Sequence, residues 1–440
     1  MSTSADRTDD QLLITDVRIF DGIGDELRAG HVRIDGRKIS EVGAGDPPPP
    51  DAGTAVIDGG GRVLIPGLSD AHAHVLLAGA TQGELVGGGA GLGYLKGAAE
   101  AEAMLMRGFT TIRDMAGDTA DLRRVLDAGI LPGPRIYPSQ AALSQTAGHG
   151  DFGMVYDEPT ALGGTPTRAE QLGLMRVADG RARVLAAVRE QLKRGASQIK
   201  MMAGGGVTST YDPLDVVQFT PDELRAGVEA AADWGTYVSV LVYTGPGIRR
   251  AVDAGVKVIE HGHLAAEDDI KRMADGGVWL STQPFVESDH SYTSPDSREK
   301  NRRVCQGVEK TFAWAVEHGV DIAFGTDLLL DPGSSHKQGE MLARLAGLCG
   351  SSVAGLKVAT SGNAELFRLA GPRDPYQAGA SAGEHPSPHE NRLGVVAEGA
   401  WADVLLVEQD PTRDLAVLAD PDNLAVIVKD GRVHKNTLDG

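Results

Sequence analysis

The chain has 440 residues, 41% of them hydrophobic and 23% charged, which is the composition of a globular protein able to bury a sizeable core. Its 42 basic and 61 acidic residues give a net charge of −19, so it lacks the basic surface that binds nucleic-acid phosphates. No stretch approaches the roughly 20 apolar residues of a membrane span, and the first residues are too polar for a signal peptide. The two cysteines, Cys305 and Cys349, form no C-x-x-C motif. We therefore expect a cytoplasmic protein that acts on a small molecule, with no nucleic-acid or membrane partner.

Both ends of the chain have the pattern of short strands. Residues 12–65 alternate apolar and polar positions between Asp-Gly breaks, which predicts an antiparallel sheet. The same pattern returns in "ADVLLVEQDP" and "LAVIVKDGRVHKN" near the other end. Neither end is large enough to be stable alone, so we expect residues 1–64 and 392–440 to pair into one small β-sandwich domain.

Between these ends, short apolar runs alternate with amphipathic helical segments. Eight runs are candidate strands: "VLIPGLSD", "FTTIRDMAG", "GPRIYPS", "ASQIKMMAGGG", "TYVSVLVYTG", "VKVIEHG", "GVWLSTQP" and "VDIAFGTD". Such alternation indicates parallel βα units, and eight of them predict an α/β fold with a TIM-type (β/α)8 barrel over residues 65–373. Residues 374–391 are rich in Pro, Gly and Ser, which predicts a linker between the barrel and the β-domain.

Reactive residues of such a barrel lie at the carboxyl ends of its strands. In chain order these positions carry His72, His74, Arg113, Asp114, His149, Asp151, Lys200, His261, His263 and Asp327. Imidazole and carboxylate are good zinc ligands, and two histidines at i and i+2 on an extended segment point to the same side. We therefore expect His72 and His74 to bind one metal, with Asp327 completing the site and accepting a proton. We expect His263 to have a structural role, and the remaining histidines of the barrel and the second β segment to lie on the surface: His290, His318, His336, His385, His389 and His434.

Several segments resemble, in the same order, motifs of the amidohydrolase superfamily, and most closely its dipeptidase-like and imidazolonepropionase-like branch. They are "VLIPGLSDAHAH", "GFTTIRDMAG", "ALSQTAGHGD", "QIKMMAGGGVTS", "VIEHGHL", "FGTD", "ADVLLVEQDP" and "VIVKDGRV". The resemblance implies a paired metal site, usually of zinc, in which His72, His74 and Asp327 bind one ion and His261 the other. Carbon dioxide would convert Lys200 to a carbamate that bridges the two ions.

The resemblance also implies a reaction. A water shared between the metals would attack a carbonyl carbon, and Asp327 would relay the proton to the leaving nitrogen. His149 and Tyr243 would stabilise the oxyanion or hold a carboxylate of the substrate. We therefore expect hydrolysis of an amide bond in a small carboxylate-bearing substrate: a dipeptide, an N-acyl amino acid, or an aryl amide such as ochratoxin. Barrels of this size commonly assemble, so a homo-oligomer is compatible with the sequence.

One position departs from the family pattern. The family has a histidine at the end of strand five, in a segment resembling V-x-V-H-A-Y-T, whereas this chain has "VSVLVYTG" with Leu241 at that place. Leucine cannot ligate a metal, so a second ion would keep only His261, the Lys200 bridge and water. Three interpretations follow: a weak or empty second site, an introduced change that disables turnover, or a divergent enzyme. The alternatives to hydrolysis are accordingly a decarboxylase, lyase or cyclase on the same scaffold, or a binding protein without activity.

Overall fold

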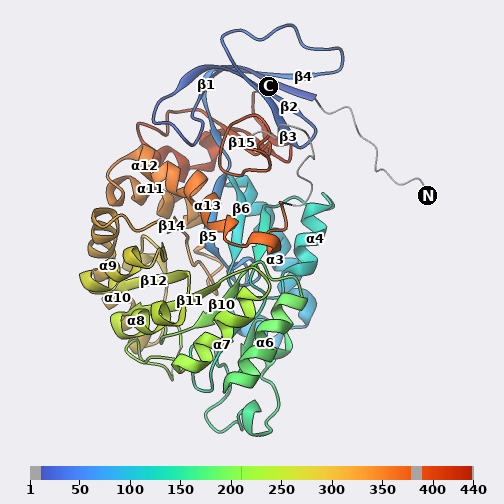
Figure 1. Ribbon diagram of the computed structural model, residues 1–440. Coiled ribbons are helices and arrows are strands. Elements are labelled where there is room, and N and C mark those ends of the chain that lie inside the picture. Colours follow the sequence, from blue (N-terminus) through green and yellow to red (C-terminus); the bar gives the residue numbers. More distant parts are fainter. Residues whose placement is uncertain (1–10, 210, 378–388, 439–440) are drawn as a thin grey trace, which may run out of the picture.

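The two ends of the chain meet in one sheet at the top of the molecule in Figure 1, a computed structural model that describes residues 11–209, 211–377 and 389–438. The sheet has the order β17-β16-β15-β4-β1-β2-β3. Its strands are β1 (Gln11–Ile19), β2 (Arg28–Asp35), β3 (Lys38–Ala44), β4 (Ala55–Pro66), β15 (Val404–Val407), β16 (Leu424–Lys429) and β17 (Arg432–Asn436). The prediction of a β-domain built from both chain ends is confirmed.

The sheet is mixed, so the prediction of a purely antiparallel N-terminal part was wrong. β1 pairs with β2 and β2 with β3 in antiparallel fashion, but β4 lies parallel to β1. The connection 45–54 after the β2–β3 hairpin carries the chain back to the free edge of β1, where β4 runs in the same direction as β1. The sheet then curls, because the amide of Ile39 donates to the carbonyl of Ala400, ahead of β15, at 3.0 Å. An apolar cluster that includes Ile14, Val32 and Val426 is buried inside it.

The middle of the chain forms the predicted TIM-type barrel. Its strands are β5 (Leu68–Ala73), β6 (Phe109–Asp114), β7 (Arg135–Pro138), β8 (Ala142–Ser144), β10 (Ile199–Met202), β11 (Val238–Thr244), β12 (Val258–Leu264), β13 (Trp279–Thr282) and β14 (Ile322–Phe324). Neighbouring strands pair in parallel. The third predicted strand, residues 133–139, is β7, which pairs with β6. The additional short strand β8 follows it and pairs with β10. The short β9 (Met175–Val177) adds to β8.

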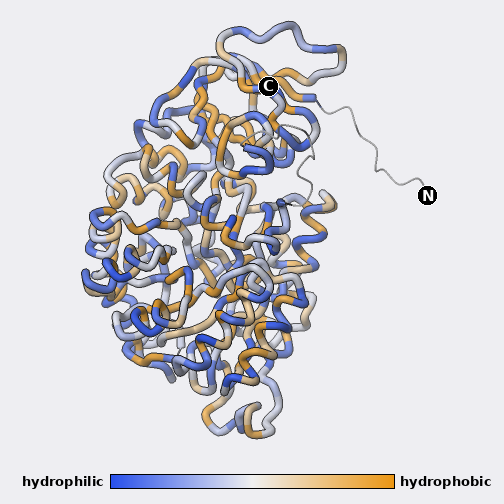
Figure 2. The backbone as a smooth tube through the Cα atoms, viewed as in Figure 1, coloured by the Kyte–Doolittle hydropathy of each residue, from blue (hydrophilic) through white to orange (hydrophobic). Residues whose placement is uncertain are grey.

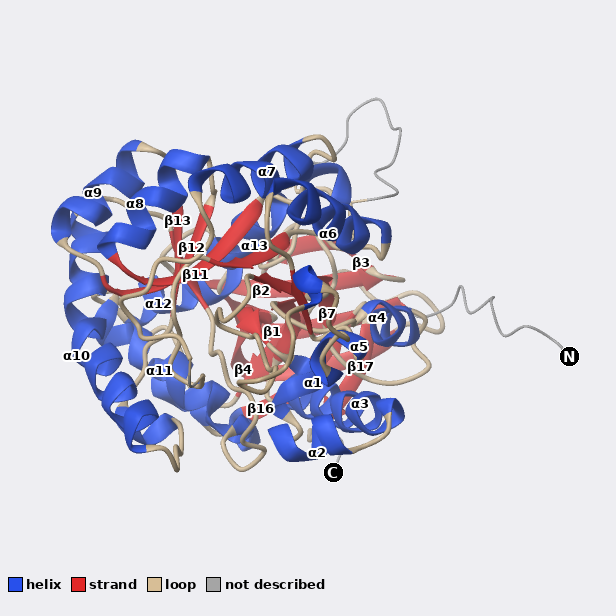
Figure 3. Cartoon of the chain, turned by 90° about the horizontal axis from the view of Figure 1, so that it is seen from below, coloured by secondary structure: helices blue, strands red, loops and turns tan. Residues whose placement is uncertain are grey.

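Helices surround these strands, as Figure 3 shows in a view turned by 90°. They are α1 (Val75–Ala78), α2 (Gln82–Gly87), α3 (Ala90–Met106), α4 (Ala120–Asp127), α5 (Arg168–Gln171), α6 (Arg181–Lys193), α7 (Pro221–Ala232), α8 (Gly245–Ala254), α9 (Glu267–Asp275), α10 (Pro295–Glu317), α11 (Gln338–Leu348), α12 (Ser352–Lys357) and α13 (Asn363–Arg368). Short 3-10 helices lie at Thr160–Leu162, Glu287–Asp289, Ser335–Lys337, Gly371–Arg373, Leu415–Ala419 and Pro421–Asn423, with a π-helical turn at Val358–Gly362. Figure 2 shows hydrophilic and hydrophobic residues along the same helices, as expected of helices with one face toward the barrel.

The sequence of α7 explains its position. Thr220 and Glu223 form a capping box, and Pro221 occupies the first turn, where its missing N–H costs nothing. Leu224 is fully buried, and a side chain at Gly227 would overlap the sulfur of Met201 on β10. A small residue is therefore needed where this helix crosses the strand that carries Lys200.

The barrel and the β-domain are joined by a continuous run of chain and by buried charge. Gly67 alone separates β4 from β5, and its amide donates to the carbonyl of Asp403 at 2.8 Å. The Arg135 guanidinium of β7, fully buried, bonds both carboxylate oxygens of Asp403 at 3.0 and 3.2 Å and also contacts Asp430. Most of the predicted linker, including His385, lies outside the described residues. None of the described helices is both long and apolar enough to cross a membrane.

Candidate metal centre and active site

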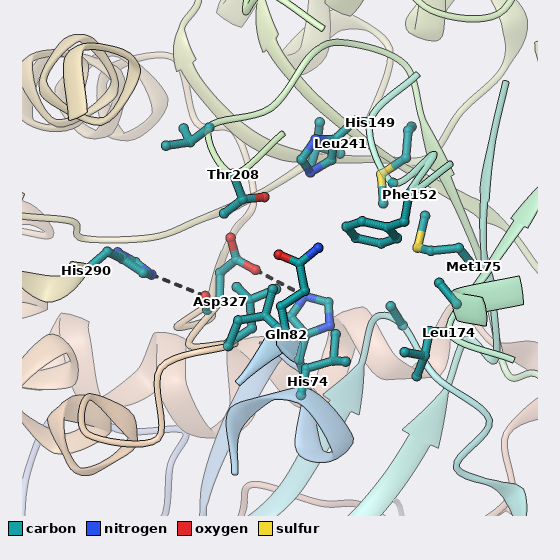
Figure 4. A pocket seen from close by; sticks show the side chains of 18 of the residues that line it. His74, Gln82, His149, Phe152, Leu174, Met175, Thr208, Leu241, His290 and Asp327 are labelled. Atoms are coloured by element: carbon teal, nitrogen blue, oxygen red, sulfur yellow. Dashed lines mark hydrogen bonds and ion pairs between the residues drawn. The ribbon is translucent and has the colours of Figure 1, made fainter. Parts of the chain in front are cut away.

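The first and last strands of the barrel bring two histidines and a carboxylate together. His72 lies near the end of β5, His74 is the residue before α1, and Asp327 follows β14. Oδ1 of Asp327 is 3.3 Å from Nε2 of His72. It is 3.0 Å from Nε2 of His74, a contact that is drawn in Figure 4. The Asp327 amide donates to the His72 carbonyl at 2.8 Å, and its φ of 52° is in the left-handed region that non-glycine residues seldom adopt. The backbone is thus bent where the carboxylate meets the imidazoles.

A third histidine completes the cluster from β12. His261 is fully buried, and its Nδ1 lies 2.7 Å from Oε1 of Gln283, whereas its Nε2 has no hydrogen-bond partner. Ligand atoms of His72, His261 and Asp327 all lie within 4.8 Å of one another. A buried imidazole nitrogen without a partner is costly in a protein interior, and a metal ion would satisfy it. These three residues therefore fit a divalent cation.

Lys200 lies at the same centre. Its Nζ is 3.4 Å from Nε2 of His72, and the side chain is buried. Burial lowers the pKa of Lys200 to about 8, because the charged form loses its hydration. Only the neutral amine of a lysine reacts with carbon dioxide, and the lowered pKa makes this neutral form more accessible.

Glu260 is the buried support of His72 and was not singled out from the sequence. Its Oε2 lies 2.8 Å from Nδ1 of His72, and its Oε1 accepts from the Arg113 guanidinium at 2.6 Å and from the Ser239 hydroxyl. Burial alone would raise the pKa of Glu260, but Arg113 and His72 hold it well below its ordinary value. Such a carboxylate keeps the proton on Nδ1 and leaves Nε2 of His72 free to ligate. The one local signal was an acidic residue directly after the apolar pair Val258 and Ile259, and it did not indicate the partners of Glu260.

His149 and Tyr243 line the same cavity as the cluster. Nδ1 of His149 lies 2.7 Å from the Ser209 hydroxyl and 3.1 Å from the Asp212 carboxylate, so Nε2 is the nitrogen left to contact a ligand. The ring of Tyr243 stacks on His261 with centroids 4.7 Å apart. Burial raises the pKa of Tyr243 well above its ordinary value, so this phenol stays protonated and can donate a hydrogen bond.

A cavity of about 1070 Å³, counted out to its mouth, opens above the cluster. Phe152, Leu174 and Met175 form one apolar wall in Figure 4, while Phe285 and Tyr292 line another part. Leu241 also lines it, together with His72, His74, His149, Lys200, Tyr243 and Asp327. The cavity thus combines a polar floor with apolar walls, which is typical of small-molecule sites.

His290 lies in the cavity wall rather than on the surface as expected. It is half-buried, its Nε2 is 3.4 Å from the carbonyl oxygen of Asp327, and its ring stacks on Tyr292 with centroids 5.8 Å apart. The loop after β13 folds over the barrel mouth, and the preceding Asp289 pairs with Arg344 at 2.6 Å. Nothing in the sequence near His290 indicates this ion pair, because its two members lie far apart along the chain.

The other rim residues do not reach the cluster. Nε2 of His263 lies 2.9 Å from the carbonyl oxygen of Gln283. Asp114 accepts from the Val75 amide at 2.8 Å, and Asp151 accepts from the amides of Ala147 and Gly153 in its own loop. These contacts hold backbone segments around the site.

This barrel, with histidines at two strand ends and an aspartate after the last strand, is the architecture of a known enzyme class. The Amidohydrolase family model matches residues 63–434, and the chain therefore belongs to the amidohydrolase family. It is 31% identical over 396 residues to ochratoxinase from Aspergillus niger, covering 85% of this chain and 76% of that protein.

Two solved structures extend the likeness over nearly the full length. A prolidase complexed with N-methylphosphonate-L-proline matches with a TM-score of 0.86 and 32% identity, covering 97% of this chain and 100% of that one. A Xaa-Pro dipeptidase with bound methionine matches with a TM-score of 0.80 and 28% identity, again covering 97% and 100%. Family and relatives together support hydrolase activity on amide bonds.

Proposed function

We propose that this chain is a metal-dependent amidohydrolase that cleaves the amide bond of a small carboxylate-bearing substrate. Candidate substrates are dipeptides, N-acyl amino acids and aryl amides such as ochratoxin. The observation that carries the proposal is the convergence of His72, His261 and Asp327, whose ligand atoms lie within 4.8 Å of one another, next to a cavity that His72 and Asp327 line. Ochratoxinase, prolidase and Xaa-Pro dipeptidase among the relatives support this choice of substrates.

The ligand set suits zinc, held by His72, His74, His261 and Asp327 with Lys200 as a carbamate. A bound divalent cation would supply Lewis-acid polarisation of the carbonyl and would lower the pKa of a water molecule.

The protein residues supply the proton transfers. Burial raises the pKa of Asp327, but the facing His72 and His74 hold it well below its ordinary value. Asp327 is therefore ionised, can accept a proton from the attacking water, and can pass it to the leaving nitrogen. The Tyr243 hydroxyl would donate a hydrogen bond to the developing oxyanion or to a substrate carboxylate. Because Nδ1–H of His149 faces the Asp212 carboxylate, Nε2 of this histidine would accept a hydrogen bond when the ring is neutral and would donate one only as an imidazolium.

Product analysis with a panel of dipeptides and N-acyl amino acids tests this proposal. Hydrolysis releases one amine and one carboxylic acid in equal amounts, and Asp327→Asn should prevent it. A metal-loaded protein that leaves every amide intact would count against the proposal.

Leu241 keeps a second function under consideration, because it stands in β11 at the position where the resemblance to the family implies a metal-binding histidine. A decarboxylase, lyase or cyclase would convert a carboxylated metabolite without releasing an amine and an acid. The same product analysis, extended to such metabolites, separates the two functions.

A further inference from the structure

The middle of β11 contributes an apolar side chain to the cavity next to the metal-capable cluster. Leu241 is only 5% exposed, and it lines the same cavity as Lys200 and Asp327. Its backbone pairs in register with Met202 on β10 and Glu260 on β12. The position between the lysine strand and the histidine strand is therefore filled by hydrocarbon.

The polar atoms around Asp327 have the spacing of ligands of a single ion. Ligands at about 2.0–2.2 Å from a tetrahedral ion lie about 3.3–3.6 Å from one another. Oδ1 of Asp327 is 3.3 Å from Nε2 of His72 and 3.0 Å from Nε2 of His74. The ligand atoms of His261, His72 and Asp327 all lie within 4.8 Å of one another. One ion can therefore be held with small adjustments of side chains already facing it.

A second ion, about 3.5–4 Å away, would need protein ligands of its own. Among the described residues at the cluster, His261 and Lys200 are the donors left for it. Nε2 of His263 lies 2.9 Å from the carbonyl oxygen of Gln283, and its Nδ1 has no hydrogen-bond partner, but its ring centroid is 6.1 Å from that of His261 and it is not among the residues whose ligand atoms lie within 4.8 Å of one another. Tyr243 is a neutral phenol stacked on His261. A catalytic zinc takes three protein ligands, and the resemblance to the family implies that a histidine at the position of Leu241 would be the third.

We propose that this chain holds a single divalent cation per active site and that Leu241 sets this number. The inference rests on the metal dependence of the proposed function, but not on its substrate. The single-ion site proposed here differs from the two-ion site that the resemblance to the family implies.

Metal content in three proteins tests the inference. The unmodified chain, Leu241→His and the matched apolar control Leu241→Ile are stripped with a chelator and reloaded with Zn²⁺ in the presence of bicarbonate. They are then desalted and measured for zinc per chain. We expect one equivalent in the unmodified chain and in Leu241→Ile, and two in Leu241→His. Reloading with Co²⁺ gives a second readout, because two neighbouring ions couple magnetically, whereas one gives an uncoupled electron paramagnetic resonance signal.

Two equivalents in the unmodified chain, or a coupled Co²⁺ signal from it, would overturn the inference. One equivalent in Leu241→His would show that Leu241 does not set the number of ions, and no bound zinc in the unmodified chain would overturn the single-ion site. If Leu241→His does not fold, the zinc content and Co²⁺ signal of the unmodified chain still decide the count. A parallel amide assay keeps the two proposals apart, because one bound ion without amide hydrolysis contradicts the proposed function alone.

Discussion

The Glu260 carboxylate supports the candidate metal centre, and replacing it with glutamine tests that role. Glu260→Gln keeps the size of the side chain but removes the charge between His72 and Arg113. Loss of a carboxylate that orients a metal-binding histidine typically weakens metal binding 10- to 100-fold, or about 1.4–2.7 kcal/mol. We expect a loss of this size in zinc affinity, measured by competition with a chromophoric chelator.

The same substitution should also destabilise the fold. Arg113 is fully buried, and its other partners are neutral: the Ala71 carbonyl at 2.6 Å, the Ser281 hydroxyl at 3.1 Å and the Tyr237 hydroxyl at 3.2 Å. Removing one member of a buried ion pair costs about 3–5 kcal/mol, because the remaining charge is left unpaired. Urea denaturation of the metal-free protein should show a loss in this range.

Ser239→Ala is the matched control for Glu260→Gln. It removes a hydrogen bond from an uncharged donor to the same ionised carboxylate and should cost about 1.5–3 kcal/mol, less than Glu260→Gln, with little effect on zinc affinity. The reasoning about the carboxylate would be refuted if Glu260→Gln bound zinc as tightly as the unmodified chain. It would also be refuted if Ser239→Ala lowered zinc affinity and the free energy of unfolding as much as Glu260→Gln does.

Three further outcomes are expected. Arg135→Met should lower the free energy of unfolding in urea by about 3–5 kcal/mol, because it leaves the buried Asp403 and Asp430 without their shared cation. Burial raises the pKa of Asp430, but Arg135, Lys429 and Arg37 hold it below its ordinary 3.8, so its stabilisation is present above about pH 4 and lost as the pH falls further. The acid side of the stability curve should therefore be shallower in Arg135→Met, and identical curves would contradict the ion-pair assignment. Asp327→Asn should reduce kcat on any amide substrate by about 10²–10⁴-fold with an unchanged circular dichroism spectrum, and near-normal turnover would exclude it as the proton carrier. Leu174→Ala should raise KM about tenfold for substrates with a bulky apolar group and leave kcat within about twofold, whereas an effect on kcat alone would place this wall away from the bound substrate.

The repeating pattern of strands and helices made the barrel predictable, because hydrophobic periodicity and βα order are local properties of the chain. The order of strand ends placed His72, His74, Lys200, His261 and Asp327 on one rim. In the structure His261 lies close to His72 and Asp327, and the other four residues line one cavity. The metal itself and the carbamate remain predictions.

Contacts between distant segments were not predictable in this way. The parallel pairing of β1 with β4 depends on the path of a ten-residue connection, and the sequence pattern favoured antiparallel strands throughout. His290 reaches the cavity because Asp289 pairs with Arg344, 55 positions further along the chain. Glu260 was missed because its partners, Arg113 and His72, lie on other strands and give no signal near it in the sequence.

The single glycine between β4 and β5 has a consequence for how substrate enters. Gly67 leaves no long connection between β4 of the β-domain and β5 of the barrel, and a Cβ at this position would overlap the Thr110 side chain. A rotation of the β-domain would pull on the strand that carries His72 and would also separate Arg135 from Asp403. Hinge closure between two lobes, a common way for two-domain enzymes to admit and enclose their ligands, is therefore incompatible with an intact metal centre here. Access to the cavity depends instead on local movement of the loops at the barrel mouth, such as the one that carries His290.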